Sequence, residues 1–176
     1  MQDIRVTSGK YRGRSIKSPN IKSTHPMGAR EKLALFNMLT DYLPGANVLD
    51  AYAGSGALGI EALSRGAAYV TFIEKNPQAT KAIRKNLADL DLLEFGKASE
   101  SDVKNFSSPD RFDIIIADPP YNDFKLTGIE NIAGFLKESG VMVVSHPNEA
   151  PKIPTFKLIK THKYAAAHLS FYRKDI

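Results

Sequence analysis

The run Asp118-Pro119-Pro120-Tyr121 directly follows an apolar stretch over residues 112–117. Proline fixes φ at about −65° and has no N–H, and the residue before a proline is driven to extended geometry. The run therefore predicts a stiff loop in which the Asp118 carboxylate and the Tyr121 ring have fixed directions. Taken alone, it is also compatible with a proline turn that only caps a strand.

A loop of this kind can activate an exocyclic amine of a nucleic-acid base. Such an amine is a weak nucleophile because its lone pair is delocalised into the ring. Asp118 and the carbonyl of Pro119 can accept its N–H bonds and favour the tetrahedral nitrogen that attacks a methyl group. Tyr121 offers a face for a base that has left its stack. We therefore expect Asp118, Pro119, Pro120 and Tyr121 to form a catalytic loop.

A second candidate site is the glycine-rich run Asp50-Ala51-Tyr52-Ala53-Gly54-Ser55-Gly56-Ala57-Leu58-Gly59. It joins a strand pattern at 48–50 to a helical pattern at 57–65, and Glu74 ends the next strand pattern. Glycines let a backbone turn tightly and approach a ligand, and such loops lie at the carboxyl edge of an open α/β sheet. The run predicts a site for a cofactor that contains a ribose.

Two cofactors fit this run. Its glycines together with Glu74 satisfy the fingerprint of a nicotinamide dinucleotide site. Asp50, however, would repel a dinucleotide pyrophosphate, whereas it can engage the ammonium group of a methionine moiety. The Asp118 loop also has no role in hydride transfer. Both features favour S-adenosylmethionine, with Glu74 accepting hydrogen bonds from the ribose hydroxyls.

Hydrophobic periodicity and turn residues predict the elements that position these loops. Strands are expected at 4–7, 15–17, 48–50, 69–73, 95–99, 112–117, 141–145, 156–161 and 168–172, and helices at 28–40, 57–65, 77–90 and 125–138. Leu33, Leu35, Phe36 and Leu39 should form the core face of the first helix. Only six residues separate the last two strands, too few for a crossover helix, so these strands should pair antiparallel.

The alternation of strands and helices predicts an α/β fold. We expect a doubly wound, mostly parallel sheet of Rossmann-like type, closed by an antiparallel strand pair, as in class I S-adenosylmethionine methyltransferases. Residues 1–27 should form a small basic β-hairpin and a linker, and residues 28–176 should form the catalytic domain.

The composition excludes several classes of protein. The 176 residues contain no cysteine, which excludes thiol chemistry, disulfides and cysteine zinc sites. The four histidines lack the spacing of metal ligands, so no metal is expected. No apolar run approaches the roughly 20 residues that cross a bilayer, and the N-terminus lacks a signal-peptide pattern. We expect a cytoplasmic protein without a membrane partner.

The charges are unevenly distributed along the chain, whose net charge is +5. Residues 1–32 hold 8 Lys and Arg against 2 Asp and Glu, and residues 152–176 hold 6 against 1. Residues 33–151 hold 10 against 16. An acidic centre between two basic ends indicates a polyanionic partner.

Several segments resemble the RsmD-type 16S ribosomal RNA guanine-N2 methyltransferases, and the resemblance spans nearly the whole chain. It is carried by the segments 9–14, 35–37, 50–67, 118–121 and 168–172. The sequence departs from the family's pattern at some positions: His25-Pro26-Met27 stands where the family usually has Arg-Pro-Thr, and Tyr52 stands where Phe is more frequent. Arg30 and Lys32 match the family's basic positions only roughly. The segment around 146–155 is also short and would lack the family's last helix.

The resemblance implies roles for individual residues. Those expected to bind the cofactor are Asp50, Ala51, Tyr52, Gly54, Gly56, Glu74 and Asp102, with Glu100 as the alternative to Asp102 for contact with adenine. Those expected to bind nucleic acid are Lys10, Arg12, Arg14, His25 and Arg30. Asp118 and Tyr121 would handle the target base.

The implied reaction is methylation of the N2 amine of a guanine by S-adenosylmethionine, in small-subunit ribosomal RNA or an assembling 30S subunit. Three alternatives stay open at this stage. A DNA adenine-N6 methyltransferase would share the catalytic loop, but few residues precede the core for reading DNA. A dinucleotide-dependent oxidoreductase would leave that loop unexplained. A non-catalytic RNA-binding protein would not need Asp50, Glu74 and Asp118.

Overall fold

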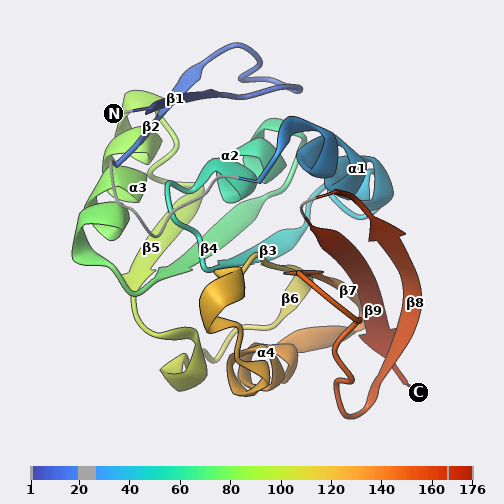
Figure 1. The fold of residues 1–176 in the computed structure, drawn as a ribbon. Helices are drawn as coiled ribbons and strands as arrows, with labels where there is room; N and C mark the ends of the chain where they lie inside the picture. Colours follow the sequence, from blue (N-terminus) through green and yellow to red (C-terminus); the bar gives the residue numbers. More distant parts are fainter. Residues whose placement is uncertain (1, 20–26, 166, 176) are drawn as a thin grey trace.

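The computed structural model describes residues 2–19, 27–165 and 167–175. Its strands are β1 Gln2–Arg5, β2 Ser15–Ser18, β3 Asn47–Ala51, β4 Tyr69–Glu74, β5 Gly96–Glu100, β6 Phe112–Ala117, β7 Leu136–His146, β8 Phe156–Lys163 and β9 His168–Lys174. Seven of them form one sheet in the order β5-β4-β3-β6-β7-β9-β8, and β1 pairs antiparallel with β2 (Figure 1). β3 to β7 are parallel, whereas β9 is antiparallel to both of its neighbours. The predicted fold class is confirmed.

Helices cover both faces of this sheet (Figure 1). They are α1 Ala29–Leu39, α2 Ala57–Ser64, α3 Pro77–Asp89 and α4 Leu126–Ala133, with the short 3-10 helices η1 Val103–Asn105 and η2 Tyr121–Asp123. α1, α2 and α3 share one core, which includes Phe36 and Ile83, while α4 and η1 share the other with Ile129. Val48 belongs to the first core and Leu49 to the second. This alternation is expected of a strand that is buried on both faces.

The last helix and the strand after it differ from the sequence prediction. The helix expected over 125–138 ends at Ala133, and β7 begins at Leu136 instead of near residue 141. Leu136 is fully buried and pairs with Phe112. A register shift next to Phe112 then accommodates an exposed segment, in which Lys137 forms a 2.9 Å ion pair with Asp113. A bulged, exposed strand lacks strict alternation, so its sequence does not distinguish it from a helix.

The core face of α1 differs from the prediction at one residue. Leu33 is 54% exposed, whereas its neighbour Lys32 is only 6% exposed. The Lys32 ammonium donates to the Arg5 carbonyl at 3.2 Å and lies 3.6 Å from the Glu61 carboxylate. Burial of a cation requires such partners because its desolvation is costly. The prediction was wrong for Leu33 and is confirmed for the other three apolar residues of the face.

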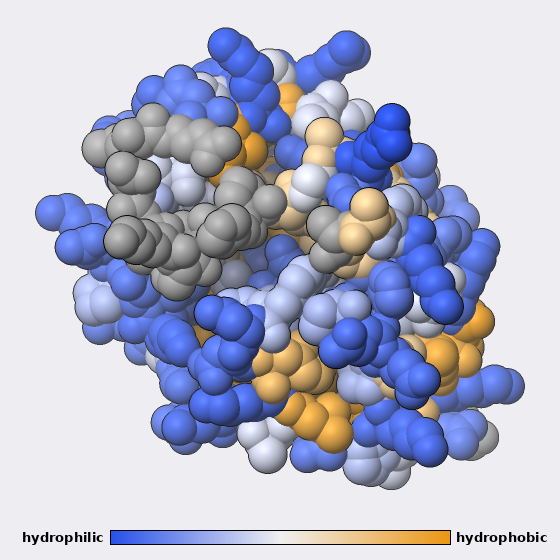
Figure 2. Space-filling view, viewed as in Figure 1, coloured by the Kyte–Doolittle hydropathy of each residue, from blue (hydrophilic) through white to orange (hydrophobic). Residues whose placement is uncertain are grey.

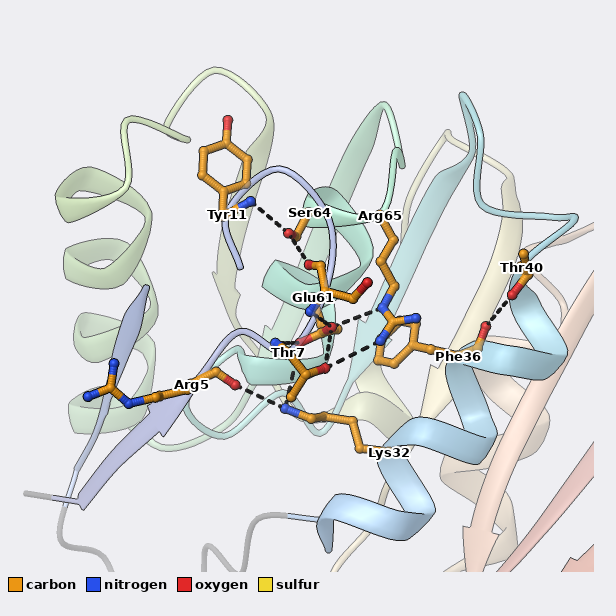
Figure 3. Close-up of polar contacts among 10 residues, drawn as sticks. Arg5, Thr7, Tyr11, Lys32, Phe36, Thr40, Glu61, Ser64 and Arg65 are labelled. Atoms are coloured by element: carbon orange, nitrogen blue, oxygen red, sulfur yellow. Dashed lines mark hydrogen bonds and ion pairs between the residues drawn. The ribbon is translucent and has the colours of Figure 1, made fainter. Parts of the chain in front are cut away.

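The hairpin is held against α2 by the buried carboxylate of Glu61 (Figure 3). This carboxylate accepts hydrogen bonds from the N–H and the hydroxyl of Thr7, at 2.9 and 2.6 Å, and from the Ser8 N–H at 3.0 Å. Arg65 Nε donates to it at 2.9 Å, and Lys32 approaches it from α1. The cluster therefore ties the hairpin, α1 and α2 together.

A buried amide connects the hairpin to α3 and to the glycine-rich loop. Asn86 accepts from the Lys17 N–H and donates to the Lys17 carbonyl, both at 2.9 Å. The same amide donates to the carbonyl of Ser55 at 3.0 Å. The hairpin thus packs directly on the remainder of the protein. The division of the chain into domains at residue 27 stays a prediction.

Candidate active site

The carboxyl ends of three neighbouring strands bring the two predicted loops together. Ala51, the last residue of β3, pairs with Ile73 of β4 and with Ala117 of β6. Tyr52, Glu74 and Asp118 therefore lie at the same edge of the sheet. From β3 the chain continues to β4 on one side of β3, and it later returns to form β6 on the other side of β3. Open α/β sheets bind their ligands at such a reversal of strand order.

A cleft of about 840 Å³ opens at this edge. Its lining includes seven of the predicted site residues, namely Tyr52, Gly54, Glu74, Asp102, Asp118, Pro120 and Tyr121. Ile4 and Ser18 of the hairpin also line it, as do Gly28 and Glu31 near the start of α1. The other predicted residues of the two loops, Asp50, Ala51, Gly56 and Pro119, are buried. The volume is in the range of roughly 300–1,000 Å³ that is usual for small-molecule sites.

The glycine-rich loop has a left-handed backbone at three positions. The φ angles are 61° at Tyr52, 56° at Gly54 and 80° at Gly56. Glycine adopts such angles without strain, whereas a residue with a Cβ is strained there by roughly 1–3 kcal/mol. Gly59 has a different role, since a Cβ on it would lie 2.2 Å from the Phe72 ring. The third glycine of the run therefore permits close packing of α2 on the sheet.

Asp50 is 1% exposed and lies beneath this loop. Its carboxylate accepts a hydrogen bond from the Gly59 N–H at 2.8 Å. Burial raises the pKa of Asp50 to about 7, the Gly59 hydrogen bond opposes this, and the charges of Asp118 and Glu74 add to the increase. A carboxylate in this environment favours the approach of a cation.

Glu74 fixes the shape of the glycine-rich loop. One carboxylate oxygen accepts from the Gly54 N–H at 2.9 Å and the other from the Asn76 N–H at 2.7 Å. Each carboxylate oxygen can accept two hydrogen bonds, so both retain capacity on the cleft side. The side chain is thus able to position the loop and to bind ligand hydroxyls together.

Asp118 and Tyr121 form the opposite wall with Ser145 of β7. Burial raises the pKa of Asp118 to about 6, and a hydrogen bond from Ser145 opposes the increase. The hydroxyls of Tyr121 and Ser145 are 2.5 Å apart. Sequence reasoning did not identify Ser145. The sequence feature that could have identified Ser145 is a polar residue at the end of the apolar strand β7. This strand pairs with β6, the strand that precedes Asp118.

A third wall contains Tyr52, Asp102 and Gly128. Burial raises the pKa of Tyr52 to about 12, and the charges of Asp102 and Asp123 contribute. Asp102 also caps η1 by accepting from the Lys104 N–H at 3.0 Å. A Cβ on Gly128 would lie 2.5 Å from the Tyr52 hydroxyl, so this glycine leaves room for the phenol. No sequence pattern identified Gly128.

The acidic side chains at the cleft fit a cationic cofactor. Among the described residues, Asp50, Glu74 and Asp118 form no ion pair with a lysine or arginine. A sulfonium with a methionine ammonium supplies positive charge, whereas a dinucleotide pyrophosphate supplies more negative charge. In the same part of the chain, no group of three His, Cys, Asp or Glu side chains has the geometry of a metal site. No described helix is long and apolar enough to span a bilayer.

Those of the predicted nucleic-acid contacts that the structure describes do not line the cleft. Lys10, Arg12 and Arg14 are exposed near the tip of the hairpin. The Lys10 N–H donates to the carbonyl of Ser64 at the C-terminal end of α2, at 2.8 Å. The cleft lies at the opposite end of this helix, about 12 Å away at 1.5 Å per residue. Arg30 is exposed on α1, and His25 lies outside the described residues.

The surface around these groups is mainly polar. Most of the side chains on the face in Figure 2 are hydrophilic, and apolar ones form small separate patches. The Lys10 ammonium lies 5.3 Å from the centre of the Tyr11 ring, and Arg14 donates to the Asp89 carbonyl at 3.0 Å. Such a surface suits a hydrated, charged partner better than an apolar one.

Comparison with known proteins gives consistent matches. The family described as conserved hypothetical protein 95 matches residues 4–173. YlbH of Bacillus subtilis, provisionally named an rRNA methyltransferase, is 34% identical over 97% of this chain and 99% of its own. Ribosomal RNA small subunit methyltransferase D of Escherichia coli K12 is 33% identical over 86% of this chain and 79% of its own.

A solved structure agrees with these sequence matches. The Escherichia coli protein yhhF, provisionally named a methyltransferase, has a TM-score of 0.89 and 28% identity to this chain, and the match covers 99% of both chains. The chain therefore belongs to the conserved hypothetical protein 95 family, which is the RsmD-type methyltransferase family that its motifs resemble.

Proposed function

We propose that this protein transfers a methyl group from S-adenosylmethionine to the exocyclic N2 amine of a guanine in small-subunit ribosomal RNA. The observation that carries the proposal is the meeting of Asp118 and Tyr121 with the glycine-rich loop in one cleft. The names of the relatives support ribosomal RNA as the substrate. The partner would then be small-subunit RNA, either free or in an assembling 30S subunit. The protein would act in the cytoplasm.

The cleft residues divide the work between cofactor and base. Glu74 would accept hydrogen bonds from the ribose hydroxyls, and Asp102 would contact adenine. Asp102 is favoured over Glu100 because Asp102 lines the cleft, whereas Glu100 is exposed at the end of β5. Asp50, which lies beneath the glycine-rich loop, would interact with the methionine end of S-adenosylmethionine. Bound S-adenosylmethionine supplies the methyl group.

Asp118 would act directly on the target amine. Its ionised carboxylate accepts an N2–H hydrogen bond together with the Pro119 carbonyl, and this favours the tetrahedral nitrogen. After transfer the nitrogen carries a positive charge, and a carboxylate with a pKa of about 6 can receive its proton. Tyr121 would stack on the base, with its ring direction fixed by Ser145. Base–aromatic stacking contributes about 1–3 kcal/mol.

Hairpin residues Lys10, Arg12 and Arg14, with His25 and Arg30, would contact RNA phosphates outside the cleft. Phosphate contacts position a nucleic acid without reading its sequence. This assignment explains why the basic tip is remote from the reacting groups while Ile4 and Ser18 of the same hairpin line the cleft.

The decisive experiment is nucleoside mass spectrometry of small-subunit ribosomal RNA from cells with and without the gene. Purified protein and S-adenosylmethionine are then added to subunits from the deficient cells. Loss and restoration of one N2-methylguanosine is the expected result. A change in N6-methyladenosine would show that the target is an adenine N6 amine instead of a guanine N2 amine. If no methylated nucleoside changed, the proposed function would be overturned.

A further inference from the structure

A second concavity of about 390 Å³ lies beside the cleft, at the carboxyl ends of β7 and β8. We call it the side groove. It is formed by the loop 147–150 together with Thr161, Lys163 and His168. None of these residues was assigned a role in cofactor or base binding above.

The side groove is continuous with the cleft along the chain. Ala167 lines the cleft, and the next residue, His168, lines the side groove. On the neighbouring strand, Ser145 contacts Tyr121 at the base-binding wall, and His146 pairs directly with His168. A polymer strand that places one unit in the cleft therefore has the side groove within reach for an adjacent unit.

The imidazole of His168 is held in a fixed orientation. Its Nδ1 lies 2.6 Å from the Asn148 carbonyl, and Nδ1 of His146 lies 3.1 Å from the same carbonyl. A carbonyl only accepts, so both rings donate from Nδ1. The two rings meet edge to face with their centres 5.6 Å apart. A planar ring that is fixed in this way can stack on a base at little entropic cost.

Buried polar groups support this arrangement from below. His146 Nε2 lies 2.7 Å from the Ser170 hydroxyl, which lies 2.8 Å from the Thr161 hydroxyl. In the neutral form of His146, Nδ1 donates and Nε2 accepts from Ser170, and Thr161 in turn donates to Ser170. This chain of hydrogen bonds fits the neutral tautomer that carries its proton on Nδ1. Burial lowers the pKa of His146, which agrees with this assignment.

The side groove also contains groups that bind phosphate and base edges. Lys163 is exposed and forms no ion pair with any described residue. The side chains of Asn148 and Glu149 are exposed on the loop. The Asn148 amide can bond to base amino and carbonyl groups, and the Glu149 carboxylate can accept from base amino groups. An aromatic platform, a free cation and polar edges are the components of a site for a single-stranded nucleotide.

We propose that the side groove binds the nucleotide next to the target guanine in the RNA strand, with His168 stacking on its base and Lys163 contacting its phosphate. The proposal depends on the proposed function, because it requires RNA as the substrate. It adds a contact to the strand that carries the target base, separate from the phosphate contacts at the hairpin.

The test measures methyl transfer to unmodified small-subunit ribosomal RNA, either free or in subunits from cells that lack the gene, whichever form the wild-type protein methylates. His168→Ala should raise KM for the RNA about tenfold, with kcat and the Kd for S-adenosylmethionine within twofold of wild type. His168→Phe keeps a flat ring and loses the hydrogen bond to Asn148, so it should restore KM to within threefold. Equal defects in both variants would overturn stacking, since they would trace the effect to the loop.

Lys163→Glu tests the phosphate contact independently of the loop. It should raise KM for the RNA about tenfold and reduce the steepness of the salt dependence of binding by about 0.7 in log Kd per log salt unit. The matched control is Lys97→Glu, because Lys97 is exposed on β5, the strand at the other edge of the sheet. An equal effect of both substitutions, or of neither, would overturn the proposal.

The failure of this proposal is distinguishable from failure of the proposed function. If wild-type protein methylates the RNA and the side-groove variants match it, only the side groove loses its role. If wild-type protein transfers no methyl group to ribosomal RNA, both proposals fall.

Discussion

Glu61 and Asp50 are buried carboxylates and Asp118 is a partly buried one, yet the surroundings of Glu61 differ in kind from those of the other two. Glu61 receives hydrogen bonds from Thr7 and Arg65 and lies near Lys32. Burial alone would raise its pKa, but these partners outweigh burial and lower the pKa. Among the described residues, no lysine or arginine forms an ion pair with Asp50 or Asp118, and burial raises their pKa values to about 7 and about 6.

The contrast separates a structural carboxylate from functional ones. Glu61 has its partners within the protein, so its charge stabilises the folded state. Asp50 and Asp118 accept hydrogen bonds from Gly59 and Ser145 but form no described ion pair, at the place where a cationic ligand and a reacting amine would bind. A buried carboxylate without a cation beside it destabilises the free protein, and binding of a cationic ligand stabilises it.

The largest expected effect is at Asp118. Asp118→Ala should lower kcat for methyl transfer to small-subunit RNA about a thousandfold, since removal of one preorganised polar group typically costs 10²–10³-fold. Titration calorimetry should find S-adenosylmethionine affinity near that of wild type. Asp118→Asn, which keeps an acceptor oxygen without the charge, should retain more activity than the alanine variant. Activity of Asp118→Ala within tenfold of wild type would contradict the assignment.

The next effect concerns the structural carboxylate. Glu61→Gln leaves Lys32 and Arg65 without their anion, so the free energy of unfolding at pH 7 should fall by about 3 kcal/mol. Urea denaturation measures this change. Asp89→Asn is the control, because its 2.9 Å ion pair with Lys85 is exposed and should contribute no more than about 0.5 kcal/mol. Equal losses in the two variants would remove the distinction between these acids.

The pH dependence of the rate should follow Asp118. Its pKa of about 6 means that the reactive, ionised form is lost as the pH falls through 6. Single-turnover methyl transfer should therefore slow about tenfold for each pH unit below about 5.5. A rate that stays constant down to pH 4.5 would show that ionised Asp118 is not required.

The contribution of Asp50 to folding stability should change with pH in the direction opposite to that of Glu61. Its pKa is raised in the folded protein, so its contribution to stability is fully present below pH 3.8 and is lost as the pH rises to 7. Asp50→Asn should remove this loss and raise Tm at pH 7.5 by about 4 °C without ligand. The same substitution should also weaken the binding of S-adenosylmethionine about tenfold. Parallel Tm profiles for variant and wild type from pH 4 to 7.5 would contradict this account.

The smallest effect is expected at Gly128. A Cβ there meets the Tyr52 hydroxyl, which is the end of a side chain that can shift, while alanine favours the helix by about 1 kcal/mol. Gly128→Ala should therefore leave Tm unchanged or slightly higher. KM for S-adenosylmethionine should rise about threefold as Tyr52 is displaced into the cleft. An unchanged KM would show that the position of Tyr52 does not affect the cofactor.

The sequence predicts most of the fold because its signals are local. The apolar strand at 112–117 and the cap at Asn76, which accepts from the Gln78 and Ala79 N–H groups, are read from neighbouring residues. The start of β7 at Leu136 was missed because a pairing with Phe112 and a register shift decide it. Lys32 was not expected in the core because its partner Glu61 lies 29 positions away in the chain.

The candidate site shows the same division. Asp118, Tyr121, Glu74 and the glycines belong to runs with a recognisable order, and the structure brings them to one edge. Ser145 and Gly128 belong to no run, and only the packing of β7 and α4 against the cleft reveals them.

The strand order β7-β9-β8 has a consequence for the growing chain. β8 leaves the ribosome before β9, yet β9 is the strand that lies between β8 and the rest of the sheet. Until β9 is made, β8 lacks the one strand with which it pairs in the finished sheet. Insertion of β9 must therefore precede the completion of this edge, and the sheet can close only after translation has passed residue 174.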